Sequence, residues 1–426
     1  MDLTQLVKQM ENCPCGKKHT VDIKDIQIGS GMLEKVGEIL EKNNFPKRIL
    51  VVSDNNALRV SKGILDNLMA HGFIFDARVY DNMRTADIKE VNEIEALCPK
   101  VDGILAVGTG SVDDICRYAA ARQGKRFAIF GTAPSMDGYA SDSSPITEGA
   151  FKLTCPAKQP EVIIADTKIL AQAPVELKAA GFGDMIAKCI GLVDWRVSAL
   201  ISDEYYCENI ANLTREAVRR IISLADKVTL DNEETAGAIM EALILTGVAM
   251  KMAGTSRPAS GCEHIISHFW ESKKLEQGLL SDYHGKKCGV ATLIVAKTYH
   301  KMAQLEAIKA HRETIDWEEV KAAYGPNLSV DMMKLNSPTI TDEVDPALLE
   351  AKWPEIRQII KDELPPYETL IDLYKRAGAA TTIEEISVTP ELCAQAYKYH
   401  PFMRHRLNLM RLRWMFDYPT DYSDNM

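Results

Sequence analysis

The sequence predicts an α/β domain with a parallel sheet, followed by an all-α domain. Up to about Asp166, short runs of apolar residues alternate with segments of helical periodicity, which is typical of parallel strands covered by helices on both faces. After Asp166 the strand pattern ends, and helical periodicity dominates to about Lys309 and less regularly to Met415. We therefore predict an α/β domain over residues 1–166 and a helical domain over residues 167–426.

Five apolar runs have the length and composition of strands in the first domain. They are Ile26–Ile28, Arg48–Val52, Phe73–Val79, Gly103–Val107 and Phe127–Phe130. The helical segments between them are residues 32–41, 57–71, 87–97 and 112–122. Two further runs, Phe151–Thr154 and Glu161–Ala165, are joined by a short polar segment, so we predict that they pair as a hairpin.

Composition excludes several classes of function. A hydrophobic fraction of 46% and a charged fraction of 26% are typical of a globular chain with a large core. The net charge of -10 argues against nucleic-acid or anionic-membrane partners. Ten scattered cysteines and no signal-like start predict a reducing, cytoplasmic location. The most apolar helix, residues 236–254, contains Glu241 and Lys251 and is expected in a bundle core rather than a membrane.

A glycine-containing loop, Gly108–Asp114, directly follows the strand that ends at Val107. Glycines let a backbone approach a diphosphate, and the next helix offers its N–H groups and positive dipole end. Ser111 can cap that helix or donate to a phosphate. A tight turn without a ligand accounts for the loop equally well.

Two other strands end in polar residues. Asp54 follows the strand ending at Val52 and can bind ribose hydroxyls or cap a helix. The segment Gly131–Ser141 follows Phe130, and its small polar side chains can line a dinucleotide. The alternative for this segment is a polar surface loop. We favour binding, because ligands of open α/β sheets lie at the carboxyl ends of the strands.

The helical domain contains a candidate metal site. His264 and His268 are four residues apart, so they share one face of a helix, and His284 opens a second apolar helix. Asp184 is the best third ligand. One carboxylate and two imidazoles suit Zn²⁺, Ni²⁺ or Fe²⁺. The alternative is a hydrogen-bonded histidine pair in a bundle.

Two terminal segments are less informative. Cys13, Cys15 and His19 invite a zinc interpretation, but a closed zinc site needs four ligands and no second cysteine pair lies nearby, so we predict a turn. Residues 400–415 mix four arginines with apolar residues. We predict a packed terminal helix with a basic exposed side, in preference to a nucleic-acid or lipid-surface helix.

Five motifs occur in one order: GTGS, TAPSMDGYAS, GFGDMIAK, SRPASGCEHIISH and HGKKCG. With them the chain resembles the glycerol-1-phosphate dehydrogenases, in the superfamily of iron-type alcohol dehydrogenases, glycerol dehydrogenases and dehydroquinate synthases. The resemblance covers roughly residues 20–310. It implies a dehydroquinate synthase-like architecture with an N-terminal nucleotide-binding domain, and NAD or NADP beside a divalent metal ion (Zn²⁺, Ni²⁺ or Fe²⁺). It also implies a homodimer that interconverts dihydroxyacetone phosphate and sn-glycerol 1-phosphate, a precursor for lipid synthesis.

The resemblance also implies roles for individual residues. It implies metal binding by Asp184, His264 and His284, and catalytic or substrate contacts by Asp137, Asp184 and His268. It implies dinucleotide contacts by Asp54, Gly110, Ser111, Val112, Asp113, Asp114, Thr132, Ala133, Pro134, Ser135 and Ser141.

A phosphorylated substrate needs a cation, and Arg257 in the SRPASG segment is our candidate, helped by Lys188 or Lys286. A structural ion pair is the alternative for Arg257. The rival functions are a glycerol dehydrogenase acting on an unphosphorylated polyol, a dehydroquinate synthase-like lyase and a regulatory protein with a degenerate metal site. Aspartate at 184 argues against the lyase, and the presence of all three candidate ligands argues against the regulatory protein.

Overall fold

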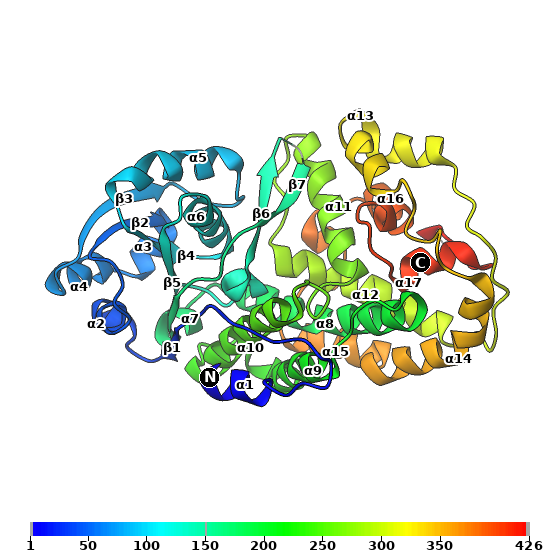
Figure 1. The fold of residues 1–426 in the computed structure, drawn as a ribbon, viewed down its shortest axis with the longest axis horizontal. Helices are drawn as coiled ribbons and strands as arrows, with labels where there is room; N and C mark the ends of the chain where they lie inside the picture. Colours follow the sequence, from blue (N-terminus) through cyan, green and yellow to red (C-terminus); the bar gives the residue numbers. More distant parts are fainter. Residues whose placement is uncertain (1–2, 150, 423–426) are drawn as a thin grey trace.

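A six-stranded parallel sheet occupies the first part of the chain in the computed structural model, which describes residues 3–149 and 151–422 (Figure 1). Its strand order is β1-β8-β5-β4-β2-β3, and every pair of neighbours is parallel. The strands are β1 (Asp25–Gly29), β2 (Arg48–Asp54), β3 (Ile74–Tyr80), β4 (Gly103–Gly108), β5 (Arg126–Gly131) and β8 (Val162–Asp166). The predicted α/β class is confirmed.

The predicted hairpin is wrong in its pairing. β7 (Phe151–Pro156) pairs antiparallel with β6 (Ser143–Glu148), a strand that the sequence analysis missed. β8 instead lies in the parallel sheet between β1 and β5. All five residues of β8 are buried, and only a central strand with both faces covered requires such a continuous apolar run.

Helices cover both faces of the sheet. They are α2 (Val36–Lys42), α3 (Asn55–Val60), α4 (Ile64–Ala70), α5 (Ile88–Leu97) and α6 (Gly110–Arg122), with α1 (Leu3–Gln9) ahead of β1. The predicted helix over residues 57–71 is interrupted at Gly63, whose φ of 98° is left-handed. One face of the sheet packs against α2 and α4 through residues such as Val51 and Phe130. The opposite face, with Leu50 and Ile129, shares its core with α6 and with helices beyond the sheet.

The rest of the chain is helical, as predicted. The helices are α7 (Thr167–Ala171), α8 (Val175–Ser202), α9 (Glu208–Ile222), α10 (Glu233–Ala253), α11 (Cys262–Glu276), α12 (His284–Met302), α13 (Trp317–Leu335), α14 (Pro346–Glu363), α15 (Tyr367–Arg376), α16 (Pro390–Tyr399) and α17 (Leu409–Leu412). α8 is buried over most of its length and packs against α9, α10, α11, α12 and α14. It is therefore the central element of this half.

The apolar helix α10 is long enough to cross a membrane, but 83% of its most apolar window is buried within the protein. It is a core helix, as expected. Its Met240 and Ile244 belong to the same core as the sheet residues Leu50 and Ile129. The sheet thus ends at Asp166, whereas the core continues across that point, and the division into two domains stays a prediction.

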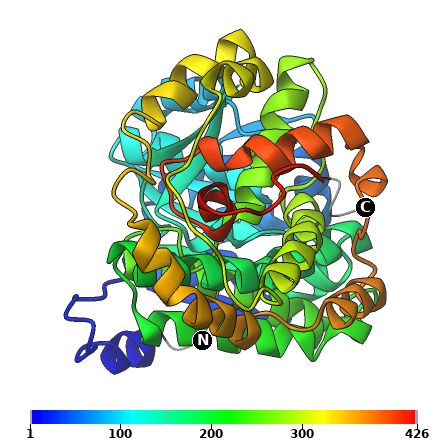
Figure 2. The ribbon, with the colours of Figure 1, turned by 90° about the vertical axis from the view of Figure 1, so that its right-hand side faces the viewer.

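The C-terminal segment is packed, but the predicted helix with a basic exposed side is wrong, because only Leu409–Leu412 is α-helical and two of the four arginines are fully buried. In Figure 2 the red end of the chain lies near the centre of the view with other helices around it, and its Leu409, Leu412 and Met415 are buried in the core. Arg411 and Arg413 are fully buried. Arg411 forms an ion pair with Glu313 at 2.7 Å, and Arg413 donates to the Tyr397 carbonyl at 2.6 Å. Local periodicity did not reveal these partners, because they come from other parts of the chain.

Candidate metal and nucleotide site

Four side chains from three helices converge in the helical half. Asp184 lies in α8, His264 in the first turn of α11, and His284 and Cys288 in the first two turns of α12. Their ligand atoms all lie within 4.8 Å of one another, and His264 Nε2 is 3.5 Å from Asp184 Oδ1. The three predicted ligands thus come together. Cys288 was missed, although its position four residues after His284 puts both on one helical face.

His264 is oriented by its neighbour in the chain. Its Nδ1 lies 2.5 Å from the buried Glu263 Oε1, so Nε2 faces Asp184. Burial alone lowers the pKa of His264, but the Cys288 thiol and the Glu263 carboxylate raise it well above its usual value. A histidine that donates one ring N–H to a carboxylate is typical of metal sites, because the hydrogen bond fixes the tautomer.

The start of α11 is itself held by a buried carboxylate. Asp194 in α8 accepts hydrogen bonds from Cys262 N at 2.8 Å and from the Tyr299 hydroxyl at 2.6 Å. These bonds attach the turn that carries His264 to the helix that carries Asp184. Neither Asp194 nor Glu263 was among the predicted site residues. Asp194 meets its partners only through the fold, whereas Glu263 directly precedes His264 and could have been recognised from that position.

Asp184 is kept ionised by its surroundings. Lys188 Nζ lies 2.6 Å from Asp184 Oδ1 and 2.6 Å from Asp137 Oδ2. The Asp137 backbone N–H donates to Asp184 Oδ2 at 3.0 Å. Burial alone raises the pKa of Asp184, but Lys188 and the histidines His264 and His284 hold it well below its usual value. Lys188 is therefore committed to two carboxylates, which argues against its predicted part in phosphate binding.

Two motif glycines allow backbones to pack closely here. A Cβ at Gly181 in α8 would lie 1.9 Å from the Pro134 carbonyl oxygen, and a Cβ at Gly285 in α12 would lie 2.1 Å from the Ala180 carbonyl oxygen. No side chain fits at either position. The glycines therefore bring α8 directly against the loop after β5 and against the start of α12.

The predicted nucleotide-binding segments meet at one edge of the sheet. Asp54 ends β2, the loop from Gly108 joins β4 to α6, and residues 132–135 follow β5. β2, β4 and β5 are neighbours in the sheet, so their carboxyl ends lie side by side. Asp54 Oδ1 accepts from Ala57 N at 2.8 Å, which makes Asp54 the helix cap that the sequence analysis allowed.

Three of the predicted nucleotide contacts are engaged elsewhere through their side chains. Asp113 and Asp114 form buried ion pairs with Arg117, which also donates to the Gly138 carbonyl at 2.5 Å. Ser141 Oγ lies 3.1 Å from Ser143 Oγ. Arg117, held by two carboxylates of its own helix, therefore fixes α6 to the segment carrying Asp137. The carboxylates of Asp113 and Asp114 thus have a structural role, and the nucleotide contacts of these two residues stay a prediction.

The predicted phosphate ligand Arg257 also needs correction. Its buried guanidinium pairs with Glu204, with Nε 2.8 Å from Glu204 Oε1, and donates to Ser198 Oγ at 3.1 Å. Ser198 is 14 residues beyond Asp184 in α8, which is about 21 Å along the helix axis. Arg257 is thus the structural ion pair that was the alternative. Lys286 is likewise paired, with Glu176 and Asp282.

Other cations surround the predicted substrate residue His268. Its ring stacks on that of His284, with centroids 5.8 Å apart. Burial, and then the positive charges of Lys152 and Arg404, hold the pKa of His268 well below its usual value, so the ring is neutral. Lys152 Nζ pairs with Glu271 at 2.9 Å, while within the described chain the Arg404 guanidinium has no carboxylate partner.

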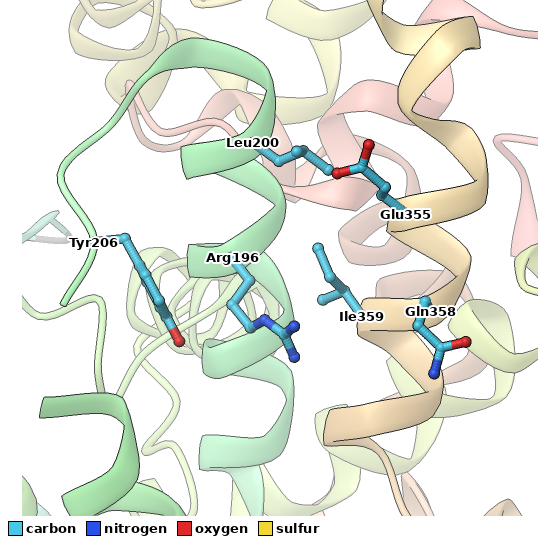
Figure 3. A pocket seen from close by; sticks show the side chains of 6 residues that line it. All are labelled: Arg196, Leu200, Tyr206, Glu355, Gln358 and Ile359. Carbon is cyan, nitrogen blue, oxygen red and sulfur yellow. The ribbon is translucent and has the colours of Figure 1, made fainter. Parts of the chain in front are cut away.

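A groove of about 380 Å³ lies between the end of α8 and α14 (Figure 3). It is lined by Arg196, Leu200, Tyr206, Glu355, Gln358 and Ile359. Arg196 already pairs with Glu363 at 2.8 Å, and it lies about 18 Å along α8 from Asp184. The groove brings no metal-ligand set together, so we assign the chemistry to the cluster around Asp184.

Comparisons with known proteins agree with this geometry. A family model described as iron-containing alcohol dehydrogenase matches residues 27–174. The chain is 32% identical to a glycerol-1-phosphate dehydrogenase (NAD(P)+) of Halalkalibacterium halodurans, over 71% of this chain and 77% of that one. It is 31% identical to the protein of that name from Bacillus velezensis, over 91% and 90%. The crystal structure of a probable glycerol dehydrogenase from Sinorhizobium meliloti shares the fold, with a TM-score of 0.60, 15% identity and 89% of each chain covered.

Proposed function

Because the chain belongs to the glycerol-1-phosphate dehydrogenase family of iron-containing alcohol dehydrogenases, we propose that it interconverts dihydroxyacetone phosphate and sn-glycerol 1-phosphate with NAD(P)H and NAD(P)+. The observation that carries this proposal is the convergence of Asp184, His264 and His284 next to the carboxyl edge of the sheet. α8 joins the two regions, because Gly181 lets it touch the loop after β5. A redox cofactor and a metal ion can therefore face one substrate.

We propose Asp184, His264 and His284 as the ligands of a divalent ion, and the donor set fits one. Asp184 is ionised and His264 turns Nε2 toward it. Burial alone raises the pKa of Cys288, but His264 and His284 lower it to about 6, which adds a soft thiolate donor within reach. Such a set favours Zn²⁺, Ni²⁺ or Fe²⁺ over Mg²⁺. When bound, the ion supplies Lewis-acid polarisation of a substrate oxygen.

The proposed dinucleotide site uses the edge formed by β2, β4 and β5. No side chain caps the N-terminus of α6, so the N–H groups of Gly110 and Ser111 are available to a diphosphate. Thr132 to Ser135 line the same edge, and Asp54 stands at the end of β2, where a ribose is commonly bound. When bound, the nicotinamide supplies the hydride in reduction.

We propose that Arg404, rather than Arg257, binds the substrate phosphate. Arg404 and Lys152 both place positive charge near the half-buried His268, but only Arg404 has no acidic partner in the part of the chain that the structure describes. A guanidinium binds phosphate bidentately. The neutral His268 ring can exchange a hydrogen bond with a substrate hydroxyl, and Lys188 holds Asp137 and Asp184 in place beside it.

The direct test is a coupled assay with purified enzyme, a panel of divalent ions, and NADH or NADPH. Dihydroxyacetone phosphate and unphosphorylated dihydroxyacetone are compared as substrates, and the product is resolved by chiral analysis. We expect strong preference for the phosphorylated ketone and sn-glycerol 1-phosphate as the product. Equal turnover of both ketones would instead identify a glycerol dehydrogenase.

We also propose that the enzyme works in the cytoplasm as a homodimer. All ten cysteines are free thiols, which suits a reducing compartment. The dimer is a prediction from the family resemblance alone. Light scattering coupled to size-exclusion chromatography measures it directly.

A further inference from the structure

Three cysteines and a histidine meet far from the nucleotide edge. Cys13, Cys15 and His19 lie in the segment before β1, and Cys207 is the N-cap residue of α9. Their ligand atoms all lie within 4.8 Å of one another. Cys13 Sγ is 3.4 Å from Cys207 Sγ, Cys15 Sγ is 3.2 Å from His19 Nε2, and Cys207 Sγ is 3.9 Å from His19 Nε2.

We propose that these four residues bind one structural zinc ion. A tetrahedral site with zinc–sulfur bonds of about 2.3 Å and a zinc–nitrogen bond of about 2.0 Å separates its donor atoms by about 3.5 to 3.8 Å. Three of the six separations are 3.2, 3.4 and 3.9 Å, which bracket that range, and all six lie within 4.8 Å. Three thiolates and one imidazole complete the coordination, so no position is open for a substrate. The site is therefore structural, and it shares no residue with the cluster around Asp184.

The groups around the four residues already present them to a metal. His19 Nδ1 lies 2.8 Å from the Met252 carbonyl oxygen. A carbonyl oxygen only accepts hydrogen bonds, so Nδ1 carries the proton. The lone pair of Nε2 therefore faces the sulfurs. The Tyr205 hydroxyl donates to Cys15 Sγ at 3.4 Å, and the Asn209 amide donates to Cys13 Sγ at 3.4 Å. Donors that point at sulfur stabilise the thiolate form.

Charge and burial agree with a metal. Three thiolates around Zn²⁺ carry one net negative charge, and Lys17 places its ammonium 3.4 Å from the centre of the Tyr205 ring beside them. Cys13, Cys207 and His19 are each at most 9% exposed. A Cys13–Cys207 disulfide is the competing explanation. The two sulfurs are farther apart than the roughly 2.0 Å of a disulfide, and that bond would leave Cys15 and His19 without a function.

Near Cys13, Cys15 and His19 in the sequence there is no fourth ligand, so a turn was predicted there. The fold supplies that ligand from 194 residues beyond Cys13. Residues 10–24 form turns and irregular backbone, and Figure 1 shows this blue segment running beside α9 and α10. The zinc ion would join it to the start of α9 and, through His19 and Met252, to the end of α10. α10 packs on the segment that carries Asp137, so the ion would brace one side of the active site from outside.

Metal content of the full-length protein tests the proposal. We purify the wild type, Cys207→Ser, the control Cys155→Ser and the double variant His264→Ala/His284→Ala under reducing conditions and measure zinc by mass spectrometry. Cys155 is a half-buried cysteine of β7 outside both clusters. We expect the double histidine variant to retain one zinc per chain, Cys207→Ser to lose one metal equivalent relative to the wild type, and Cys155→Ser to lose none.

A second measurement does not require Cys207→Ser to fold. It is X-ray absorption at the zinc edge, recorded on the double histidine variant. We expect three sulfurs at about 2.3 Å and one nitrogen. Alkylation of the native protein should leave Cys13, Cys15 and Cys207 unmodified until a chelator removes the ion. A double histidine variant without zinc, a Cys207→Ser protein with undiminished zinc, or a Cys13–Cys207 disulfide in the reduced preparation would overturn the proposal.

Discussion

His264 Nε2 lies 3.5 Å from Asp184 Oδ1, although the two residues belong to different helices. Three features produce this approach. Glu263 turns the ring, Asp194 anchors the first turn of α11 to α8, and Lys188 holds the carboxylate. The geometry is therefore built by buried groups around the two ligands, which is how metal ligands are usually oriented.

Removal of a proposed ligand should abolish activity and metal binding together. In His264→Ala or His284→Ala, we expect kcat/KM to fall at least about a thousandfold, because Lewis-acid stabilisation is worth several kcal/mol. Circular dichroism should show an intact fold. The matched control is His311→Ala, which changes an exposed histidine and should keep full activity. A fully active His264→Ala enzyme without metal would rule the site out.

Two arginine variants test which residue binds the substrate phosphate. Arg404→Ala should raise the KM for dihydroxyacetone phosphate about 10- to 100-fold, because a charge-assisted hydrogen bond contributes about 1.5–3 kcal/mol. The KM for dihydroxyacetone should change little. Arg257→Ala should weaken stability through Glu204 but leave the ratio of the two KM values unchanged. Steady-state kinetics with both ketones measures these KM values. If Arg257→Ala raised the KM for dihydroxyacetone phosphate but not that for dihydroxyacetone, Arg257 would be the phosphate ligand.

The contact between α8 and the loop after β5 should not tolerate a side chain at Gly181. A methyl group there would lie 1.9 Å from the Pro134 carbonyl oxygen, so Gly181→Ala should destabilise the protein by about 1–3 kcal/mol or more. Because the loop moves, affinity for NAD(P)H should fall as well. Gly29→Ala is the control, since its nearest neighbour would be 3.5 Å away. Urea unfolding and fluorescence titration with NADH measure the two effects.

The ion pair between Arg257 and Glu204 should make stability depend on pH. Burial alone raises the pKa of Glu204, but Arg257 lowers it below its usual value. The unfolded chain therefore binds more protons near pH 4, and the stabilisation is present above the unfolded pKa of about 4.3 and lost as pH falls through the folded pKa. Glu204→Gln should be about 1–3 kcal/mol less stable than wild type at pH 7.

The difference between Glu204→Gln and wild type should shrink below about pH 4. Urea unfolding of both proteins at pH 7, 4 and 3 measures it. A gap that stays constant over this range would show that Glu204 does not titrate in the way its contact with Arg257 requires.

Local sequence patterns determined the elements and the motif residues. Continuous apolar runs predicted the strands of the parallel sheet, and helical spacing placed His264 and His268 on one face. The motif resemblance pointed to Asp184 and His284, which the fold then brought together. Such patterns can be read from a sequence because strand and helix periods involve only neighbouring residues.

Partners from distant parts of the chain were decided only by the tertiary structure. β8 pairs within the sheet rather than with β7, Arg257 meets Glu204 rather than a substrate, and Cys207 joins Cys13 and Cys15. Each outcome depends on which surfaces pack together, and buried polar groups take whichever partner that packing brings within reach. Residue spacing along the chain does not predict these contacts, because they form between different helices and strands rather than within one of them.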